Sequence, residues 1–128
     1  MAMYHFANKI IKNKEIEEYN HGKMLRDYTY IDDIVDGIVS CIVSDYSYEI
    51  FNLGNGKSEE LMTMIQIIEE ELGLSARIKF KEIQPGDVEK THANIDIERK
   101  KLSYEPKVDI QKGIPKFINW FKTYHNIN

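Results

Sequence analysis

Apolar residues recur three and four positions apart in several stretches of the chain, which is the pattern of an amphipathic helix. The clearest stretch lies between Ser58, a suitable N-cap residue, and Gly73, a typical C-terminal stop. Residues 1–12 carry a second apolar stripe. The C-terminal segment carries a third, and we expect that helix to be regular only from about Pro115, since proline is unfavourable inside a helix.

Residues 32–43 form the fourth stripe, with apolar side chains at helical spacing: Ile34, Val35, Ile38, Val39, Ile42 and Val43. Asp32 is the expected N-cap of this helix, and Asp33 favours the positive end of its dipole. A shorter helix is predicted from Asp96, as its cap, to Leu102.

Three further segments have the composition of strands. Residues 15–20 are expected to form a short strand, and residues 20–23 a turn in which Asn20 or Gly22 adopts a positive φ angle. Residues 48–56, "YEIFNLGNG", read as a strand that stops in a Gly/Asn loop, and residues 76–83 as a half-exposed strand. Helices and strands alternate, so we predict a single domain over residues 1–128 of the α/β (α+β) class.

Composition and charge narrow the classes of function. The chain has 128 residues, 42% hydrophobic and 30% charged, with a net charge of −4. This length suits one domain, and the negative charge disfavours general nucleic-acid binding. No apolar stretch approaches the roughly 20 residues needed to cross a bilayer, so no membrane span is predicted. The single cysteine, Cys41, and the absence of a signal-like start favour a reducing, cytoplasmic setting.

The four histidines have no metal-ligand spacing, so we expect no metal site. Neither a G-x-G-x-x-G nor a G-x-x-x-x-G-K-[ST] loop occurs, so no dinucleotide or P-loop site is predicted in this chain. Cys41 lies in an apolar helix and is interpreted as an inert core thiol.

Three loops could carry chemistry. Arg26 offers five fixed donors suited to phosphate oxygens, although for a lone arginine a salt bridge to Asp27 or Asp32 is the more common role. The "NLGNG" loop could bring backbone amides close to an anion, but two glycines after a strand usually mean only a turn. "QPGD", residues 84–87, is a turn sequence whose Asp87 could accept a pair of sugar hydroxyls.

The succession "NHGKMLRDYTYIDDIVDGI", "FNLGNG", "QPGDVEKTHANI", "LSYEP" and "GIPKFINWF" resembles the C-terminal part of NAD-dependent epimerase/dehydratases. These nucleotide-sugar enzymes belong to the extended short-chain dehydrogenase/reductase superfamily, and the resemblance is strongest to UDP-glucuronate 4-epimerases. It covers the whole chain in the right order. It implies the small C-terminal substrate-binding domain, without the N-terminal Rossmann domain that binds NAD.

The resemblance also implies roles for individual residues. Arg26 matches the family arginine that contacts the diphosphate, and Asp87 matches the acidic residue expected at the nucleotide ribose. Gln84 stands where many sugar epimerases have a second phosphate-binding arginine, and glutamine there is typical of the glucuronate subgroup. Tyr19 is carried over as a neighbour of the uracil, and Asn52 as a further substrate contact.

The implied parent reaction is hydride abstraction from C4 of a UDP-sugar by NAD, rotation of the 4-keto intermediate, and hydride return to its other face. The base and the cofactor belong to the Rossmann domain, so we expect no catalytic residue, no Tyr-x-x-x-Lys spacing and no bound cofactor in this chain. Ser103 replaces the glycine of the family's "LGY-x-P" motif, which we interpret as a local structural change without catalytic meaning.

The chain therefore resembles a fragment that is inactive alone. In the family, the helix after "YIDD" and the "FNLG" segment pack on the Rossmann domain, so we expect an exposed apolar surface here and a homo-oligomer. Three hypotheses remain open: a substrate-binding part of an epimerase, a freestanding UDP-sugar-binding module, and a remnant that folds but binds nothing.

Overall fold

The computed structural model describes residues 2–127. The elements in chain order are α1 (Ala2–Ile11), β1 (Glu15–Glu18), the 3-10 turn η1 (Asn20–Gly22), β2 (Leu25–Asp27), α2 (Ile31–Val43), β3 (Ser58–Glu60), α3 (Leu61–Leu72), β4 (Arg77–Phe80), α4 (Asp96–Leu102) and α5 (Ile110–His125). The mixture of helices with small parallel and antiparallel sheets confirms the predicted α/β class.

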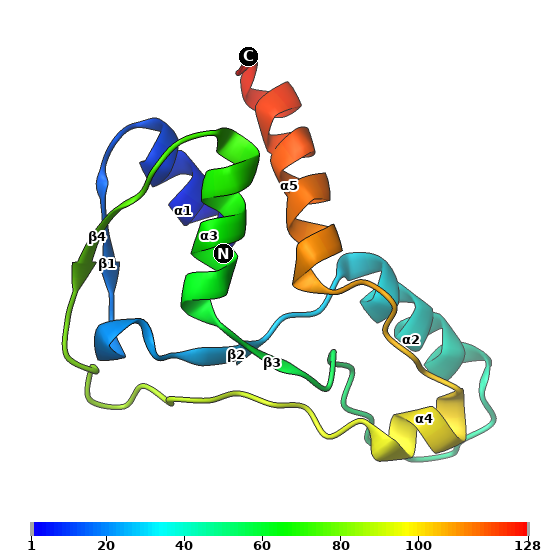
Figure 1. Cartoon of the computed structure of the whole chain (residues 1–128). Helices are drawn as coiled ribbons and strands as arrows, with labels where there is room; N and C mark the ends of the chain where they lie inside the picture. Colours follow the sequence, from blue (N-terminus) through cyan, green and yellow to red (C-terminus); the bar gives the residue numbers. More distant parts are fainter. Residues whose placement is uncertain (1, 128) are drawn as a thin grey trace.

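Most of the apolar core lies among three helices. Figure 1 shows α1, α3 and α5 gathered at one end of the molecule, with α2 and α4 at the other end. The main core contains apolar side chains from α1, β1, α3 and α5, all less than 5% exposed: Ala7, Ile10, Ile16, Met64, Ile65, Ile68, Ile110, Ile114, Ile118 and Phe121. The α2–α4 end has a second and smaller core of Ile95, Leu102 and Tyr104.

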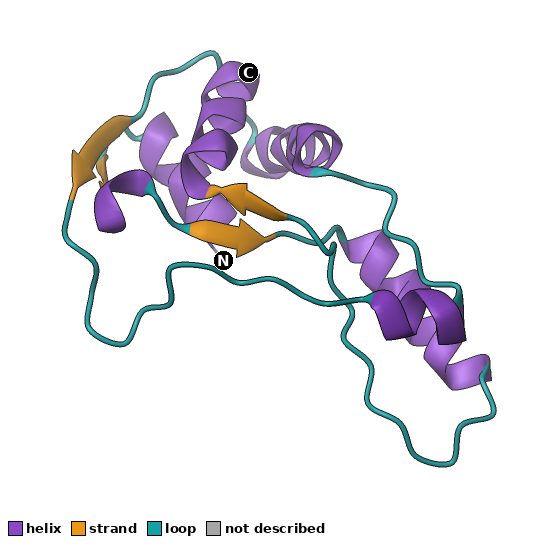
Figure 2. Cartoon of the chain, turned by 60° about the horizontal axis from the view of Figure 1, so that its bottom comes forward, coloured by secondary structure: helices purple, strands orange, loops and turns teal. Residues whose placement is uncertain are grey.

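The chain forms two short sheets, of which the β2–β3 ribbon lies between these ends (Figure 1). β1 pairs with β4 in parallel, and β2 pairs with β3 in antiparallel orientation, with Arg26 opposite Glu59. On its other edge β2 meets residues 89–91, because Leu25 donates to the Glu89 carbonyl at 2.8 Å and accepts from the Thr91 amide at 3.1 Å. Figure 2 shows the β2–β3 ribbon between the helices, and the long loops that precede β3 and α4. β2 is thus the central strand of a three-segment sheet.

Helix α2 differs from an ordinary amphipathic helix, because most of its large apolar side chains are exposed. Its buried residues are Asp33 and Gly37. Its large apolar side chains face outward, with 46 to 77% of their surface exposed: Ile31, Val35, Ile38, Val39, Ile42 and Val43. Gly37 permits close contact with the rest of the molecule, since a Cβ atom there would lie 2.7 Å from Leu53 Cδ2. The predicted exposed apolar surface is present on this helix.

Several sequence predictions are correct. Residues 15–18 and 77–80 are strands, and Asn20, His21 and Gly22 all have positive φ. Gly73 ends α3 in the left-handed conformation with φ of 64°. The short helix from Asp96 to Leu102 also forms, although Ile95 occupies its N-cap position.

Several further local predictions are wrong. Ser58 does not cap α3, because residues 58–60 pair with β2 as strand β3. Residues 48–56 are not a strand, because none of their backbone groups joins a ladder. Tyr30, not Asp32, is the N-cap of α2. Helix α5 starts at Ile110, five residues before Pro115, because the Asp109 side chain accepts from the Lys112 amide and starts the helix there.

Candidate functional site

Arg26 lies on β2 and points toward the edge shared with residue 89. Its Nη1 atom donates to the carbonyl of Leu25 at 2.8 Å and of Glu89 at 3.3 Å. Among residues 2–127 no ion pair involves Arg26, so the alternative salt bridge to Asp27 or Asp32 does not form. Nη2 and Nε donate to no described acceptor, which leaves part of the guanidinium fork for an anion.

The "QPGD" segment forms the predicted turn. The Asp87 amide donates to the Gln84 carbonyl at 3.1 Å, and Gly86 has a φ of 91°, which is the geometry of a type II turn with Pro85 at its second position. Gln84 and Asp87 are exposed, and the chain runs from Asp87 to Glu89, whose carbonyl contacts Arg26. Along the chain, only Val88 separates this turn from the residue that contacts Arg26.

The backbone amides of the "NLGNG" loop do meet an anion, and that anion is Asp27. Asp27 Oδ1 accepts from the Asn55 amide at 2.9 Å, and Oδ2 accepts from the amides of Gly56 and Ala93, both at 3.0 Å. Gly54 packs so closely against Ala93 that any Cβ atom at position 54 would collide with the Ala93 side chain. The loop is held beside β2 and the 89–93 segment by this carboxylate.

Asn52 is held from a second side. Its backbone amide donates to Glu98 Oε1 at 2.5 Å, while its side chain is exposed. Glu98 is only 1% exposed, and its Oε2 has no hydrogen-bond partner among the described residues. The hydroxyl of Tyr104 donates to the Gly54 carbonyl at 2.9 Å, and burial raises the pKa of Tyr104 to about 12. Buried polar side chains thus fix the loop from Asn52 to Gly56.

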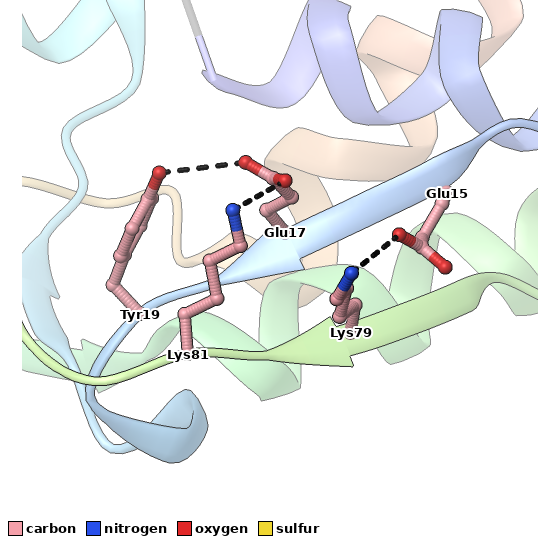
Figure 3. A network of polar contacts seen from close by, with 5 residues as sticks. All are labelled: Glu15, Glu17, Tyr19, Lys79 and Lys81. Carbon is pink, nitrogen blue, oxygen red and sulfur yellow. Dashed lines mark hydrogen bonds and ion pairs between the residues drawn. The ribbon is translucent and has the colours of Figure 1, made fainter.

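Tyr19 lies apart from Arg26, on the exposed face of the β1–β4 pair. Its hydroxyl donates to Glu17 Oε2 at 3.4 Å, and Lys81 Nζ lies 2.5 Å from Glu17 Oε1 (Figure 3). The hydrogen bond from Lys81 lowers the pKa of Glu17 and raises the pKa of Lys81. Of the five predicted site residues, Arg26 contacts the segment that follows the Gln84–Asp87 turn, Asn52 belongs to the loop held by Asp27 and Glu98, and Tyr19 lies in a separate network.

The expectation that the chain lacks a Tyr-x-x-x-Lys spacing is wrong, because Tyr19 and Lys23 stand four positions apart. The two residues flank η1, whose His21 has the left-handed φ of 51°. Side chains four apart are direct neighbours on the surface of an α-helix, which the chain does not form here. The Tyr19 hydroxyl bonds Glu17 rather than the Lys23 side chain.

An apolar groove lies between the start of α2 and helix α5. Its volume is about 410 Å³, and its walls include Tyr28, Tyr30, Phe117 and Trp120. Lys116 Nζ lies 4.9 Å from the centre of the Tyr30 ring, in cation–π geometry. The Tyr28 hydroxyl is buried without a described partner, and burial raises the pKa of Tyr28 to about 12. The groove continues the exposed apolar face of α2 through Ile31 and Ile34.

Residues 2–127 contain no group of three or more His, Cys, Asp or Glu side chains arranged to hold a metal ion. In the same range, every helix is too short or too polar to span a membrane.

Sequence comparison connects these features to known proteins. Residues 1–54 match the NAD dependent epimerase/dehydratase family. The uncharacterized protein MJ1055 of Methanocaldococcus jannaschii is 50% identical over 121 residues, which cover 94% of this chain and 37% of that protein. UDP-glucuronate 4-epimerase 4 of Arabidopsis thaliana is 34% identical over 143 residues, covering 98% of this chain and 33% of the enzyme. The chain thus spans between a third and a half of these relatives.

Solved structures of epimerases also resemble this chain. UDP-glucuronic acid 4-epimerase from Bacillus cereus, in complex with UDP-glucuronic acid and NAD, superposes with a TM-score of 0.88 at 26% identity. The match covers 97% of this chain and 40% of the enzyme, and it falls in the C-terminal part. The epimerase Mth375 from Methanothermobacter thermautotrophicus has a TM-score of 0.90 at 25% identity, over 99% of this chain and 38% of that protein.

The Bacillus cereus enzyme binds NAD, and residues 2–127 of this chain offer no matching site for its pyrophosphate. A dinucleotide pyrophosphate needs free backbone amides in a glycine-rich loop at a helix start. The Gly54–Gly56 loop is the one place where two glycines lie close in sequence, and its Asn55 and Gly56 amides already donate to the Asp27 carboxylate. This loop does not fit an NAD pyrophosphate, since a negative charge already occupies its amides.

Sequence reasoning missed two residues that shape the site, Asp27 and Glu98. Asp27 was considered only as a salt-bridge partner of Arg26, and Glu98 drew no interpretation. No spacing rule connects position 27 with positions 55 and 93, or position 98 with position 52, because these contacts exist only after the loops are brought together.

Proposed function

We propose that the chain is a member of the NAD-dependent epimerase/dehydratase family and forms the part of a nucleotide-sugar 4-epimerase that binds the UDP-sugar. The observation that carries this proposal is Arg26, a guanidinium held by two backbone carbonyls and free of any described carboxylate. A half-buried arginine without an ion-pair partner needs an anion, and a diphosphate suits its fork of donors.

In this proposal, residues around β2 contact different parts of the nucleotide. Arg26 binds the diphosphate, Asp87 accepts the ribose hydroxyls, and Gln84 contacts the phosphates from the same turn. Asn52 contributes its exposed side chain from the loop that Glu98 and Asp27 hold. Tyr19 contacts the uracil, which requires its hydroxyl to leave Glu17 or its ring to present a face. The relatives named UDP-glucuronate 4-epimerases support a UDP-glucuronate-type sugar.

The chemistry itself is assigned to the other part of such an enzyme. NAD and the catalytic Tyr-x-x-x-Lys pair belong to the Rossmann domain, and this chain alone is proposed to be inactive. The outward apolar face of α2, together with the groove beside α5, is proposed to pack on that domain when it is present. In its absence the same face is proposed to mediate self-association, giving a homo-oligomer in a cytoplasmic setting.

Titration calorimetry of the full 128-residue chain with UDP tests the binding role. We expect weak but saturable binding of UDP and none of NAD, because half of the site's wall lies outside this chain. Uridine, which lacks the diphosphate, should bind far more weakly than UDP.

Arg26→Ala should remove roughly 1.5 to 3 kcal/mol of UDP binding free energy, since a charge-assisted contact is lost. Arg77→Ala is the matched control, because Arg77 is exposed on β4 and donates only to the Asn13 carbonyl at 3.5 Å. Equal UDP affinity of Arg26→Ala and the parent chain would refute the diphosphate role of Arg26. Saturable NAD binding would refute the assignment of NAD to the Rossmann domain.

A further inference from the structure

We propose that Asp27 is the positioning residue of the nucleotide site, which holds the loops on both sides of Arg26 in the binding geometry. This inference rests on the proposed function, because the site it organises is the one assigned to UDP. Asp27 does not touch the ligand in this proposal. It acts through the backbone amides of residues 55, 56 and 93.

The alternation of side chains along β2 separates Arg26 from Asp27. Consecutive residues of a β-strand point to opposite faces, so Arg26 and Asp27 leave β2 on different sides. The carboxylate of Asp27 accepts three backbone amides at 2.9 to 3.0 Å, and its own amide donates to Thr91 Oγ1 at 3.1 Å. One residue therefore ties together β2, the loop before β3 and the segment that follows the "QPGD" turn.

These ties act on a loop whose backbone amides belong to no helix or strand. No residue from 44 to 57 belongs to a strand or helix, so its amides have no ladder to join. Gly54 lies directly on Ala93, and Gly56 has a φ of 70°, so the loop approaches the 93 segment closely in a conformation that favours glycine. A carboxylate that accepts from Gly56 and Ala93 with the same oxygen fixes this approach.

The same arrangement leaves the charge of Arg26 available. A carboxylate that accepts three amide hydrogens is stabilised without a cation, and Asp27 forms no ion pair among residues 2–127. The alternation of the strand also keeps this carboxylate on the face opposite Arg26. Asp27 therefore both shapes the loops and keeps its negative charge away from Arg26.

The test compares Asp27→Asn with Asp33→Asn in the full chain. Asp33 is a matched control, because its carboxylate also accepts two backbone amides, those of Lys107 and Val108, both at 3.0 Å, outside the nucleotide loops. Hydrogen exchange followed by NMR should show lost protection of the amides of Asn55, Gly56 and Ala93 in Asp27→Asn, with unchanged protection in α3 and α5. Retained protection of these three amides would overturn the inference, whether or not UDP binds.

UDP affinity supplies the second readout, measured under conditions in which circular dichroism shows each variant folded. Asp27→Asn should weaken UDP binding by about ten-fold or more, as expected for misplaced ligand contacts, while Asp33→Asn keeps the parent affinity. Equal losses in both variants would show general destabilisation and overturn the positioning role. If Asp27→Asn does not fold, Asp27→Glu, which moves the carboxylate by one methylene, is read by the same two criteria.

Failure of the two proposals is distinguishable. If the parent chain does not bind UDP, the proposed function fails, and amide protection alone decides the role of Asp27. If the parent chain binds UDP and Arg26→Ala does not, but Asp27→Asn binds like the parent, the proposed function stands and the positioning role fails.

Discussion

Glu98 accepts a 2.5 Å hydrogen bond from the backbone amide of Asn52, which lies 46 positions earlier in the chain. The Glu98 side chain is buried, since the residue is only 1% exposed. A buried carboxylate in that position is tolerated because it satisfies a loop amide that no strand pairs. Its second oxygen has no described partner, which makes the neutral amide of glutamine a conservative replacement.

Replacing Glu98 by alanine should lower the free energy of unfolding by about 3 kcal/mol, because the Asn52 amide loses its acceptor and a cavity is left. Glu98→Gln keeps an acceptor oxygen and should cost about 1 kcal/mol or less. Urea denaturation followed by circular dichroism measures both. Glu70→Ala, at an exposed position of α3, is the control and should stay within about 0.5 kcal/mol of the parent. Equal effects of Glu98→Ala and Glu70→Ala would contradict this account.

The buried carboxyl of Glu18 predicts a pH-dependent stability. Glu18 is 1% exposed, neither of its oxygens has a described partner, and burial raises its pKa from 4.5 to about 7, against a smaller opposing effect of Lys9. The folded state therefore holds this proton more tightly than the unfolded state. The resulting stabilisation is fully present below pH 4.5 and is lost as the pH rises toward 7 and above.

The parent chain should lose on the order of 3 kcal/mol of unfolding free energy between pH 4.5 and pH 8 from this residue, taking about 1.4 kcal/mol per pKa unit. Glu18→Gln should remove this part of the pH dependence, as measured by urea denaturation at several pH values. Glu17→Gln is the neighbouring control. The pKa of Glu17 is lowered by Lys81, so its contribution is lost only as the pH falls below 4.5, and the decline above pH 5 should persist in that variant.

Ser103 should be replaceable by glycine with a gain in stability. Ser103 has a φ of 52° at the C-terminal end of α4, and this left-handed conformation is unfavourable for residues with a Cβ atom. Ser103→Gly should raise the free energy of unfolding by roughly 0.5 to 1 kcal/mol, as thermal or urea denaturation would show. Ser44 ends α2 with a φ of −83°, so Ser44→Gly should give no gain. A stabilised Ser44→Gly together with an unchanged Ser103→Gly would refute the conformational argument.

The outward face of α2 predicts self-association of the isolated chain. Ile42 and Val43 are 76% and 77% exposed, so Ile42→Lys should leave the stability of the monomer nearly unchanged. The same change should shift the chain toward a monomer in light scattering, because it places a charge in an apolar contact. Gln66→Lys adds the same charge at an exposed position of α3 and should leave the mass unchanged. A parent chain that is monomeric at micromolar concentration would contradict the prediction.

Periodicity alone predicts the helices well, since the buried stripes of α1, α3 and α5 follow the spacing expected of core-facing helices. It fails where tertiary contacts override local preference. Residues 58–60 have the composition of a helix start, yet pairing with β2 satisfies their backbone groups as a strand. Residues 48–56 look like a strand, but side-chain carboxylates take the amides of Asn52, Asn55 and Gly56.

The candidate site shows the same contrast between local sequence signals and tertiary contacts. The "QPGD" turn was accessible from the sequence, because it depends on local geometry. Arg26 was expected in a loop, but it lies on β2, because pairing with β3 makes residues 25–27 a strand. The roles of Asp27 and Glu98 were not accessible from the sequence, since each depends on two segments that meet only in the folded chain. The helical spacing of α2 also conceals its orientation, because an apolar stripe does not tell whether it faces this chain or a neighbour.

The α2–α4 end of the molecule has only three buried apolar residues, while three acids, Asp27, Asp33 and Glu98, bind its loops through backbone amides. This reverses the usual distribution of mutational tolerance. In most domains the least replaceable positions are apolar and the acidic ones vary freely. In this half of the chain, saturation mutagenesis would find its strictest positions at carboxylates and at Gly54 and Gly37, while the apolar positions of α2 would accept almost any residue until a partner covers them.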